Sequence, residues 1–404
     1  MRRLFTILFA LCLLGSCSRG VKFDIEGRLA QRAASTVYLV VQNNQTDTIA
    51  SAPVLDNNTF RLRGEVTEPT TAFICDDIGN ALAILLVEQS PITIRALSEG
   101  GYIAEGGPIN DKYNLIASRL SDLAKQIMEI TPEQEDAEEH YESLVAKYNT
   151  ILSTSITDNL DNIIGVELFT TQEALTMTAE DMRVRMNQFS PKMRELQRMR
   201  EFAEYIETYA RSEIGQPFID LEVESITGGK RSLSEICGKG KWVLLDFWAT
   251  WCEPCMQEIP YQQQAYSKYA LRGFEICAIS LDRDADRWRS FVTQNGLLWS
   301  HFIDSTDAAA PAAAEAYGLH TIPANFLISP DGVIVARNLH GEALLHELEH
   351  YLEQSYRPTT VWQSAHCTAE TKIIQKNFEK DLHRKKKCRI FALAISKWLR
   401  SSTE

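Results

Sequence analysis

The sequence predicts an α/β protein: a three-layer sandwich at the C-terminal side, preceded by a small β-rich domain and a helical segment. Three observations support this class. From about residue 213, apolar strand-like runs alternate with helical segments and end in a hairpin and a helix. Residues 21 to 105 hold short β-rich runs between turn signals, and residues 108 to 212 are charged with helical periodicity. At 404 residues the chain has room for two or three domains of about 100–200 residues each.

The N-terminus indicates export. Arg2 and Arg3 precede an apolar run, Leu4 to Leu14, which is too short for the roughly 20 apolar residues that span a bilayer, so it is typical of a signal peptide. Leu14-Gly15-Ser16-Cys17 resembles a bacterial lipobox. The resemblance implies that residues 1–16 are a lipoprotein signal peptide and that Cys17 is lipidated. An ordinary signal peptide with an incidental cysteine is the alternative.

Residues 17–106 form the predicted β-rich domain. Its strand-like runs are bounded by turn residues, which is typical of a small antiparallel sheet or sandwich: 37–41, 59–64, 71–75, 82–87 and 92–95. The segment contains no catalytic constellation, so we expect a spacer or a partner-binding module.

Residues 107–212 form the predicted helical domain. Helix starts are expected at Thr131-Pro132, at Thr178 and at Ser190-Pro191, where a hydroxyl can cap the helix. Apolar residues at three- and four-residue steps predict buried stripes: Leu115, Leu120, Leu123, Tyr141, Leu144, Val145, Tyr148 and Leu152. The acidic run from Glu133 to Glu139 is interpreted as a solvated face rather than a metal site.

Residues 213–356 form the predicted sandwich. In order, we expect a hairpin turning at Gly228-Gly229, a buried strand 242–248, a helix from Cys252, a strand 274–281 and a helix through Trp288. A strand 325–328, a second strand after the Asp331-Gly332 turn and a helix at about 342–354 complete it. Gly215 to Phe218 mark the entry to this domain.

A Cys-x-x-Cys pair lies where the buried strand passes into the helix. Cys252 and Cys255 are spaced to close a small disulfide ring on the first helical turn. A thiolate near the unpaired N–H groups of a helix start is stabilised, so its pKa should fall below about 8.5. Cys252 is therefore the candidate nucleophile, and Cys255 resolves the mixed disulfide. A zinc site would need a second Cys or His pair, and the chain has no second Cys-x-x-Cys.

Around these cysteines the sequence resembles a known family. The segment from Val243 to Cys255 resembles the active-site strand and helix of thioredoxin-fold proteins, and Trp251 to Pro260 resembles more narrowly the ResA/TlpA-type thiol–disulfide oxidoreductases. The resemblance covers about residues 213 to 355. It implies an enzyme with a thioredoxin-like fold that reduces protein disulfides, such as apocytochrome cysteines in cytochrome c biogenesis, with electrons from a membrane thiol donor. The β-rich region resembles a domain of unknown function found before such domains in Bacteroidetes.

The resemblance also implies roles for residues around the cysteines. Asp246 would assist proton transfer at Cys255, although the narrower family commonly carries asparagine there. Glu258 would influence the acidity of the thiols. Trp251, Glu253 and Pro254 would face the substrate.

Thr321-Ile322-Pro323 matches the family's cis-proline loop. Without the resemblance, Pro323 would be an ordinary trans turn residue. With it, the backbone of Ile322 is expected to pair with a substrate peptide as a short added strand.

The rest of the chain limits the possible functions. A net charge of −13 argues against nucleic acid as a partner, because phosphate binding needs a basic face. The cysteines left over are an odd set that does not suggest a disulfide framework, although a structural pair is possible: Cys75, Cys237, Cys277, Cys367 and Cys388.

Two further motifs are interpreted as incidental. His346 and His350 match the H-E-x-x-H zinc motif but should lie opposite the apolar face of their helix. The basic extension 357–404 could touch anionic lipid or be dispensable. We therefore expect no metal, and no cofactor besides the Cys252–Cys255 disulfide.

We thus expect an oxidoreductase of the cell envelope, lipid-anchored and facing the periplasm or the extracellular side. Two alternatives are a thiol peroxidase and an envelope binding protein with a secondary redox site. Peroxiredoxins share a Pro-x-x-x-Thr-x-x-Cys motif, and this chain has Leu245 where the proline belongs.

Overall fold

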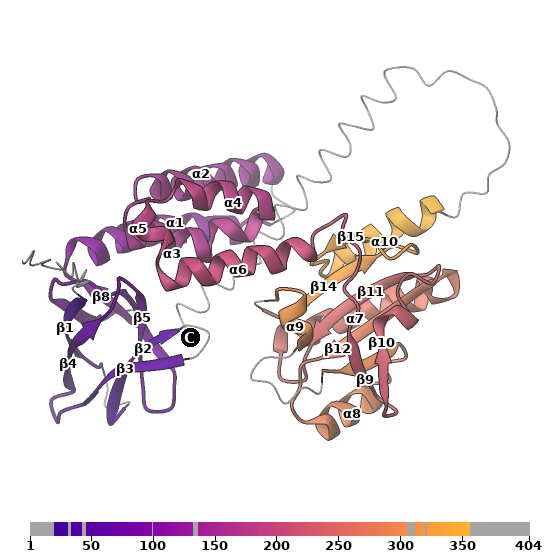
Figure 1. Ribbon diagram of the computed structural model, residues 1–404, viewed down its shortest axis with the longest axis horizontal. Coiled ribbons are helices and arrows are strands. Elements are labelled where there is room, and N and C mark those ends of the chain that lie inside the picture. Colours follow the sequence, from indigo (N-terminus) through magenta and orange to yellow (C-terminus); the bar gives the residue numbers. More distant parts are fainter. Residues whose placement is uncertain are drawn as a thin grey trace, which may run out of the picture. The chain divides into compact units, whose positions relative to one another are not determined.

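The computed structural model describes residues 20–355 except 31–33, 43–45, 99, 132–135, 305–311 and 320. The predicted signal peptide, Cys17 and the extension from 357 lie outside these residues. Two compact units are present. The first contains the described residues up to Glu173 together with Ser190–Arg198, and the second contains Ala174–Phe189 and the described residues from Met199 onward (Figure 1).

The first unit begins with a sandwich of two four-stranded sheets, ordered β4-β1-β7-β8 and β3-β2-β5-β6. Alternate residues of β1 point inward, so Phe23 and Ile25 are buried while their neighbours are not. Strands β1 and β7 pair in parallel, whereas the other pairs in both sheets are antiparallel. The strands are β1 (Val21–Arg28), β2 (Thr36–Gln42), β3 (Thr46–Pro53), β4 (Thr59–Val66), β5 (Thr71–Cys75), β6 (Ala81–Leu86), β7 (Ile92–Ala96) and β8 (Tyr102–Glu105).

Four helices complete this unit: α1 (Pro108–Met128), α2 (Ala137–Thr157), α3 (Ile163–Thr171) and α5 (Pro191–Arg194). Ser190 caps α5 as predicted, by accepting the Met193 N–H. Helix α2 begins at Ala137, after Asp136, whose backbone is left-handed (φ 63°). The helix start predicted at Thr131-Pro132 falls on residues 132–135, which lie outside the described residues. Leu115 is 54% exposed, so its predicted burial is wrong. The buried stripe of α1 runs instead through Ile116, Leu120, Ala124 and Ile127.

The buried carboxylate of Glu167 connects α3 to the sandwich and to the partly exposed Arg198. Glu167 on α3 is 3% exposed and lies 2.9 Å from Nη1 of Arg198. The Thr71 hydroxyl on β5 donates to the same carboxylate at 2.6 Å, and Arg198 Nε donates to the Thr170 hydroxyl. The Glu167 carboxylate is therefore paired and hydrogen-bonded, as a buried charge must be.

The second unit is built on a mixed seven-stranded sheet, ordered β10-β9-β13-β12-β11-β14-β15. Its strands are β9 (Glu222–Ser225), β10 (Lys230–Ser232), β11 (Trp242–Trp248), β12 (Phe274–Ser280), β13 (Ser300–Ile303), β14 (Ala324–Ile328) and β15 (Ile334–Arg337). Its helices are α4 (Ala179–Gln188), α6 (Gln197–Arg211, whose first two residues belong to the first unit), α7 (Glu253–Tyr269), α8 (Ala285–Gln294), α9 (Ala312–Ala316) and α10 (Glu342–Ser355). Thr178 caps α4 as predicted. Three short 3-10 helices lie at Glu173–Thr176, Leu233–Glu235 and Ala270–Arg272.

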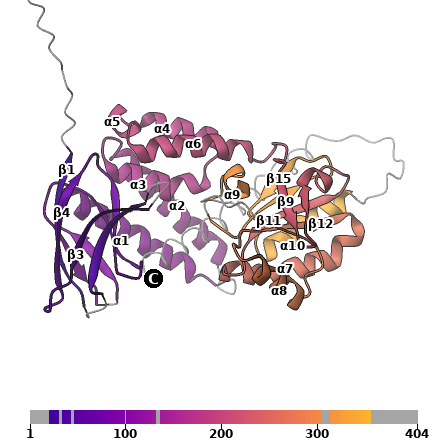
Figure 2. The same cartoon turned by 60° about the horizontal axis from the view of Figure 1, so that its bottom comes forward.

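Helices cover this sheet on both faces, which gives three layers (Figure 2). Leu244, Asp246 and Trp248 of β11 point to the face covered by α7, α8 and α10, and the alternate residues Val243, Leu245 and Phe247 point to the face with α9. β11 is buried because it lies between β12, its parallel neighbour, and β14, its antiparallel neighbour. The predicted fold class is confirmed.

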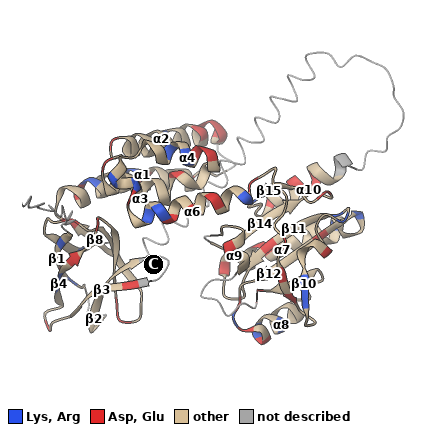
Figure 3. Ribbon diagram, viewed as in Figure 1, with Lys and Arg blue, Asp and Glu red and all other residues tan. Residues whose placement is uncertain are grey.

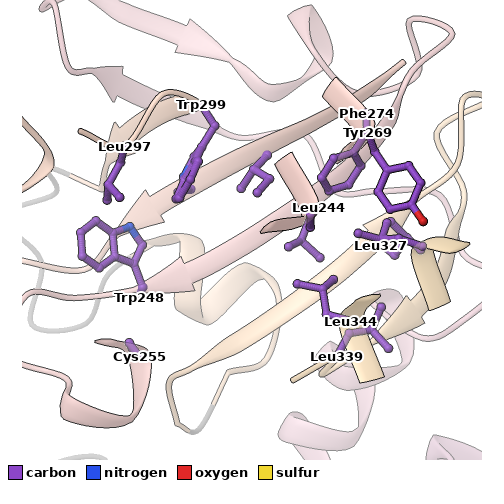
Figure 4. Packing of buried hydrophobic residues seen from close by; sticks show 14 of the residues in the cluster. Leu244, Trp248, Cys255, Tyr269, Phe274, Leu297, Trp299, Leu327, Leu339 and Leu344 are labelled. Atoms are coloured by element: carbon purple, nitrogen blue, oxygen red, sulfur yellow. The ribbon is translucent and has the colours of Figure 1, made fainter. Parts of the chain in front are cut away.

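Figure 4 shows the core on the α7 face of the sheet. Leu244, Tyr269 and Leu327 gather toward one end of β11, whereas Trp248 and Trp299 lie at the end near Cys255. The cysteines therefore lie at the edge of a continuous hydrophobic core. Lys and Arg alternate with Asp and Glu over the described parts of both units (Figure 3).

Candidate active site at the start of helix α7

The site is built where the central strand β11 ends and α7 begins. β11 ends at Trp248, and Cys252 is the N-cap residue of α7, with Pro254 in its first turn. Cys252 and Cys255 form a disulfide with their Cα atoms 5.3 Å apart. Both are almost buried, at 5% and 3% exposure.

Cys252 has the environment of a stabilised thiolate. Its Sγ accepts the backbone N–H of Cys255 at 3.2 Å and so acts as the helix cap. The positive end of the helix dipole and an N–H donor both favour negative charge on this sulfur. Cys255 is the third residue of α7, and its sulfur does not cap the helix. This geometry favours Cys252 over Cys255 as the position for a thiolate.

The loop between β11 and α7 is held by Asp282, which follows β12. The carboxylate of Asp282, 4% exposed, accepts the Thr250 N–H at 2.8 Å and the Thr250 hydroxyl at 2.7 Å, and Ser280 donates to it at 2.6 Å. Sequence reasoning missed this residue. A carboxylate shortly after the buried strand that runs parallel to β11 could have indicated it, because the carboxyl ends of parallel strands meet at the same edge of the sheet.

Asp246 lies in the core beneath the disulfide. It is 3% exposed and, together with Cys255, lines a small cavity. Burial raises the pKa of Asp246 to about 7; a hydrogen bond with the Gln262 side chain opposes this rise, and the nearby Glu258 charge adds to it. Asp246 can therefore gain and lose a proton near neutral pH.

Glu258 lies one turn beyond Cys255 and is largely buried, at 15% side-chain exposure. Its Oε2 accepts the Gly341 N–H at 2.8 Å, and its Oε1 lies 3.6 Å from Nδ1 of His340. Burial raises the pKa of Glu258, and the Gly341 hydrogen bond opposes that rise. Sequence reasoning did not identify His340.

Asn325 fixes the chain at Leu339, two residues before Gly341, whose N–H donates to Glu258. Asn325 Nδ2 donates to the Leu339 carbonyl, and the Leu339 N–H donates to Asn325 Oδ1, both at 2.8 Å. Asn325 pairs directly with Asp246 across β14 and β11. This positioning residue was also missed, because its partner lies 14 residues away.

The residues proposed to face substrate lie around the disulfide on the outer side. Trp251 is 61% exposed, and Glu253 and Pro254 are also exposed. The Ile322–Pro323 peptide bond is cis, as the resemblance implied. Ile322 packs against the hydrophobic cluster that contains both cysteines.

Other chemistry-bearing residues lie away from this site. Cys75, Cys237 and Cys277 have free thiols, and Cys277 is fully buried in the core as expected. His346 is exposed, while His350 packs edge-on against Tyr351. Among residues 20–355, outside the undescribed gaps, no three His, Cys, Asp or Glu side chains are grouped to hold a metal ion.

Comparisons with known proteins agree with this geometry. The AhpC/TSA family matches residues 214–337, and a domain of unknown function (DUF4369) matches residues 23–113. The thiol-disulfide oxidoreductase ResA of Bacillus thuringiensis (strain Al Hakam) is 35% identical over 144 residues, which is 36% of this chain and 79% of the relative. The chain belongs to the ResA family of thiol–disulfide oxidoreductases. It is therefore an enzyme with a thioredoxin-like catalytic domain.

Further ResA relatives and solved structures are similar to the same region. ResA of Bacillus subtilis (strain 168) is 37% identical over 110 residues, covering 27% of this chain and 58% of the relative. The C-terminal domain of a putative thiol-disulfide oxidoreductase from Bacteroides thetaiotaomicron is 32% identical, with a TM-score of 0.34, over 36% of this chain and 99% of that one. The thioredoxin domain of a thiol-disulfide oxidoreductase from Bacteroides vulgatus is 28% identical, with a TM-score of 0.32, over 35% of this chain and 98% of that one.

Proposed function

We propose that this ResA-family enzyme reduces protein disulfides outside the cytoplasm through the Cys252/Cys255 dithiol. The observation that carries the proposal is the asymmetry of the pair: Cys252 caps α7, while Cys255 lies in the core above Asp246. One cysteine is thus arranged to ionise, and the other lies next to a buried proton acceptor. This division of roles suits two-step disulfide exchange.

In the first step the Cys252 thiolate attacks one sulfur of the substrate disulfide. A mixed disulfide forms, and the second substrate sulfur leaves as a thiolate. The exposed Trp251 and the backbone of Ile322 would hold the substrate peptide, in the manner of a strand added to a sheet edge.

In the second step Cys255 loses its proton to Asp246 and attacks Cys252 Sγ. The Cys252–Cys255 disulfide forms, the bond from Cys252 to the substrate breaks, and the remaining substrate thiolate leaves. The substrate gains two electrons and the dithiol loses two. A membrane thiol donor would return them, and apocytochrome cysteines would be one substrate class.

The location is proposed from the N-terminal sequence. The apolar run before Cys17 favours export and lipid attachment at that cysteine. No helix of the described residues is long and apolar enough to span a bilayer. The lipid on Cys17, and not a membrane-spanning helix of residues 20–355, would hold the enzyme at the cell envelope.

Trapping of mixed disulfides tests the proposal. Cys255→Ser should accumulate mixed disulfides with exported proteins, because attack by Cys252 persists while resolution is lost. Cys252→Ser should trap nothing, and Cys75→Ser, which changes a free thiol of the other unit, should behave as wild type. Trapping through Cys255 in place of Cys252 would overturn the assignment. A Cys252/Cys255 potential near −270 mV supports a reductase, and one near −120 mV an oxidant.

A further inference from the structure

The two sheets of the N-terminal sandwich differ in charge. Strands β4, β1, β7 and β8 contain nine charged residues, whereas β3, β2, β5 and β6 contain one, Asp47 (Figure 3). In the first sheet these side chains point outward and pair with one another, as Arg61 does with Asp24 and Arg95 with Glu105. Such a face is typical of a sheet that contacts water. The outward face of the second sheet has a different composition.

The outward side chains of the second sheet are apolar. In the strand register, Val40, Phe73 and Ile84 form one row, and Tyr38 and Cys75 form the next. Their neighbours along each strand point into the core of the sandwich, so these five residues point away from it. Ile84 is 37% exposed, and the other four are half-buried. We call these five residues the apolar face.

Where helices meet this sheet, its outward residues are fully covered. Thr71 and Leu86 form the adjoining row, and both are buried. The Thr71 hydroxyl donates to Glu167 of α3, and the Leu86 N–H donates to the side chain of Asn110 of α1. A contiguous exposed set of apolar side chains marks an interaction site on a soluble protein. The apolar face therefore also calls for a partner.

The chain contains a segment that matches this face. Residues 357–404 hold eleven Lys or Arg and four Asp or Glu, a net charge of +7, so residues 1–356 carry −20. Within this basic extension, residues 390–399 are mostly apolar. Phe391, Ile395 and Trp398 follow at three- and four-residue steps, which predicts a single apolar stripe. A basic run, 384–389, directly precedes the stripe.

Charge and length both allow this segment to meet the apolar face. Exposed carboxylates lie at two ends of the face: Asp47 pairs with Val41, next to Val40, and Asp77 follows β5 after Cys75. The 34 residues 356–389 can span at most about 110–120 Å. A unit of about 170 residues is roughly 40 Å across. The segment can therefore reach any face of either unit.

We propose that residues 390–399 dock on the apolar face of the sandwich in their own chain. The apolar stripe packs on Val40, Phe73 and Ile84, and the flanking cations lie near Asp47 and Asp77. Because the segment and the face belong to one chain, their effective concentration is high, which favours this contact over one with a second copy or with lipid. The sandwich thus acts as an internal docking module. This role does not depend on the redox chemistry of the cysteines in α7.

Photo-crosslinking in the full-length protein tests the proposal. The protein is reconstituted into vesicles of phosphatidylcholine and phosphatidylglycerol, so that anionic lipid and other copies can compete for the segment. Tyr38 is replaced by p-benzoylphenylalanine, and the products are identified by mass spectrometry in a mixture of ¹⁴N- and ¹⁵N-labelled protein. The expected product is a cross-link within one chain to residues 390–399. The same probe in place of Thr93, which is exposed on the charged sheet, should not reach them.

The alkylation rate of Cys75 by iodoacetamide gives a second measurement, because the docked segment covers this thiol. Ile84→Lys adds a cation to the apolar face, and Trp398→Asp breaks the apolar stripe without altering the sandwich. Each should raise the rate by about 10- to 100-fold, the change in a docking equilibrium expected when one large apolar side chain is no longer buried. Thr93→Lys makes the same change of charge on the other sheet and should leave the rate unchanged.

A cross-link from position 38 to a second copy or to lipid, or the absence of one to residues 390–399, would overturn the proposal. An unchanged alkylation rate in Trp398→Asp would do so too. In that case a faster rate in Ile84→Lys would report only a local distortion of the sheet.

Discussion

Replacing Asp246 by asparagine should change how the stability of the catalytic unit depends on pH. Burial raises the Asp246 pKa from 3.8 to about 7, a shift of roughly three pH units, each equivalent to about 1.4 kcal/mol. The carboxyl of the unfolded chain ionises near its ordinary pKa, while the folded one stays protonated. The folded state therefore loses about 4 kcal/mol of stability as pH rises from about 4 to about 7.

The sign follows from proton counts. Between the two pKa values the folded state binds more protons than the unfolded state, so raising the pH favours unfolding, and above pH 7 the loss is complete. From pH 5 to pH 8 the remaining loss is about 3 kcal/mol. Asparagine cannot ionise, so Asp246→Asn should not suffer this loss. Relative to wild type, the variant should gain about 3 kcal/mol of stability between pH 5 and pH 8.

Tryptophan fluorescence during denaturant unfolding of the oxidised protein measures this difference. Five of the seven tryptophans, Trp242 to Trp299, lie in the catalytic unit, and none precedes residue 242. Glu253→Gln, at an exposed carboxylate of the same helix, is the matched control and should change stability equally at both pH values. If the difference between wild type and Asp246→Asn is the same at pH 5 and pH 8, Asp246 does not titrate with a raised pKa.

Three further predictions follow from other parts of the molecule. Cys17→Ser should release the mature protein from membranes in cell fractionation; retention there would assign the anchor to another segment. Glu258→Gln should lower the thiol pKa in absorbance titrations of the reduced protein, because it removes a nearby negative charge; an unchanged pKa would exclude this role. Arg198→Ala should destabilise the N-terminal unit by about 1–3 kcal/mol, the cost of leaving a buried polar group without its partner, since it removes the cation beside the buried Glu167 carboxylate. Circular dichroism melting would show this loss, and an unchanged melting temperature would contradict it.

The sequence predicted elements best where local pattern and tertiary environment agree. The apolar run 242–248 coincides with β11, because a central strand is buried on both faces and needs no alternation. The hairpin at Gly228-Gly229 also forms, since both glycines adopt the positive φ that the turn requires. By contrast, β13 has four residues and begins with Ser300 and His301, so neither its length nor its pattern indicated a strand.

The parts of the site that the sequence did not reveal depend on distant partners. Asp282, Asn325 and His340 each act on a residue from another element, at separations of 14 to 82 positions. No local pattern distinguishes such a polar residue from a solvated one. The predicted burial of Leu115 was wrong for a related reason. Leu115 lies one position from the buried stripe through Ile116 and Leu120, and only tertiary packing decides which face of α1 is buried.

In the proposed mechanism each cysteine must lose its thiol proton before it attacks, and the site provides a different means for each. In the proposed mechanism the start of α7 stabilises the Cys252 thiolate, so that attack by Cys252 would need no base. Cys255 lines the small cavity with Asp246, where burial disfavours charge, so in the proposed mechanism its proton would pass to an acceptor whose pKa is raised by burial. Glu258 raises the pKa of that acceptor, Asp246, through its charge. Neutralising Glu258 should therefore ease ionisation of both the thiols and Asp246, and thereby shift the resolving step to lower pH.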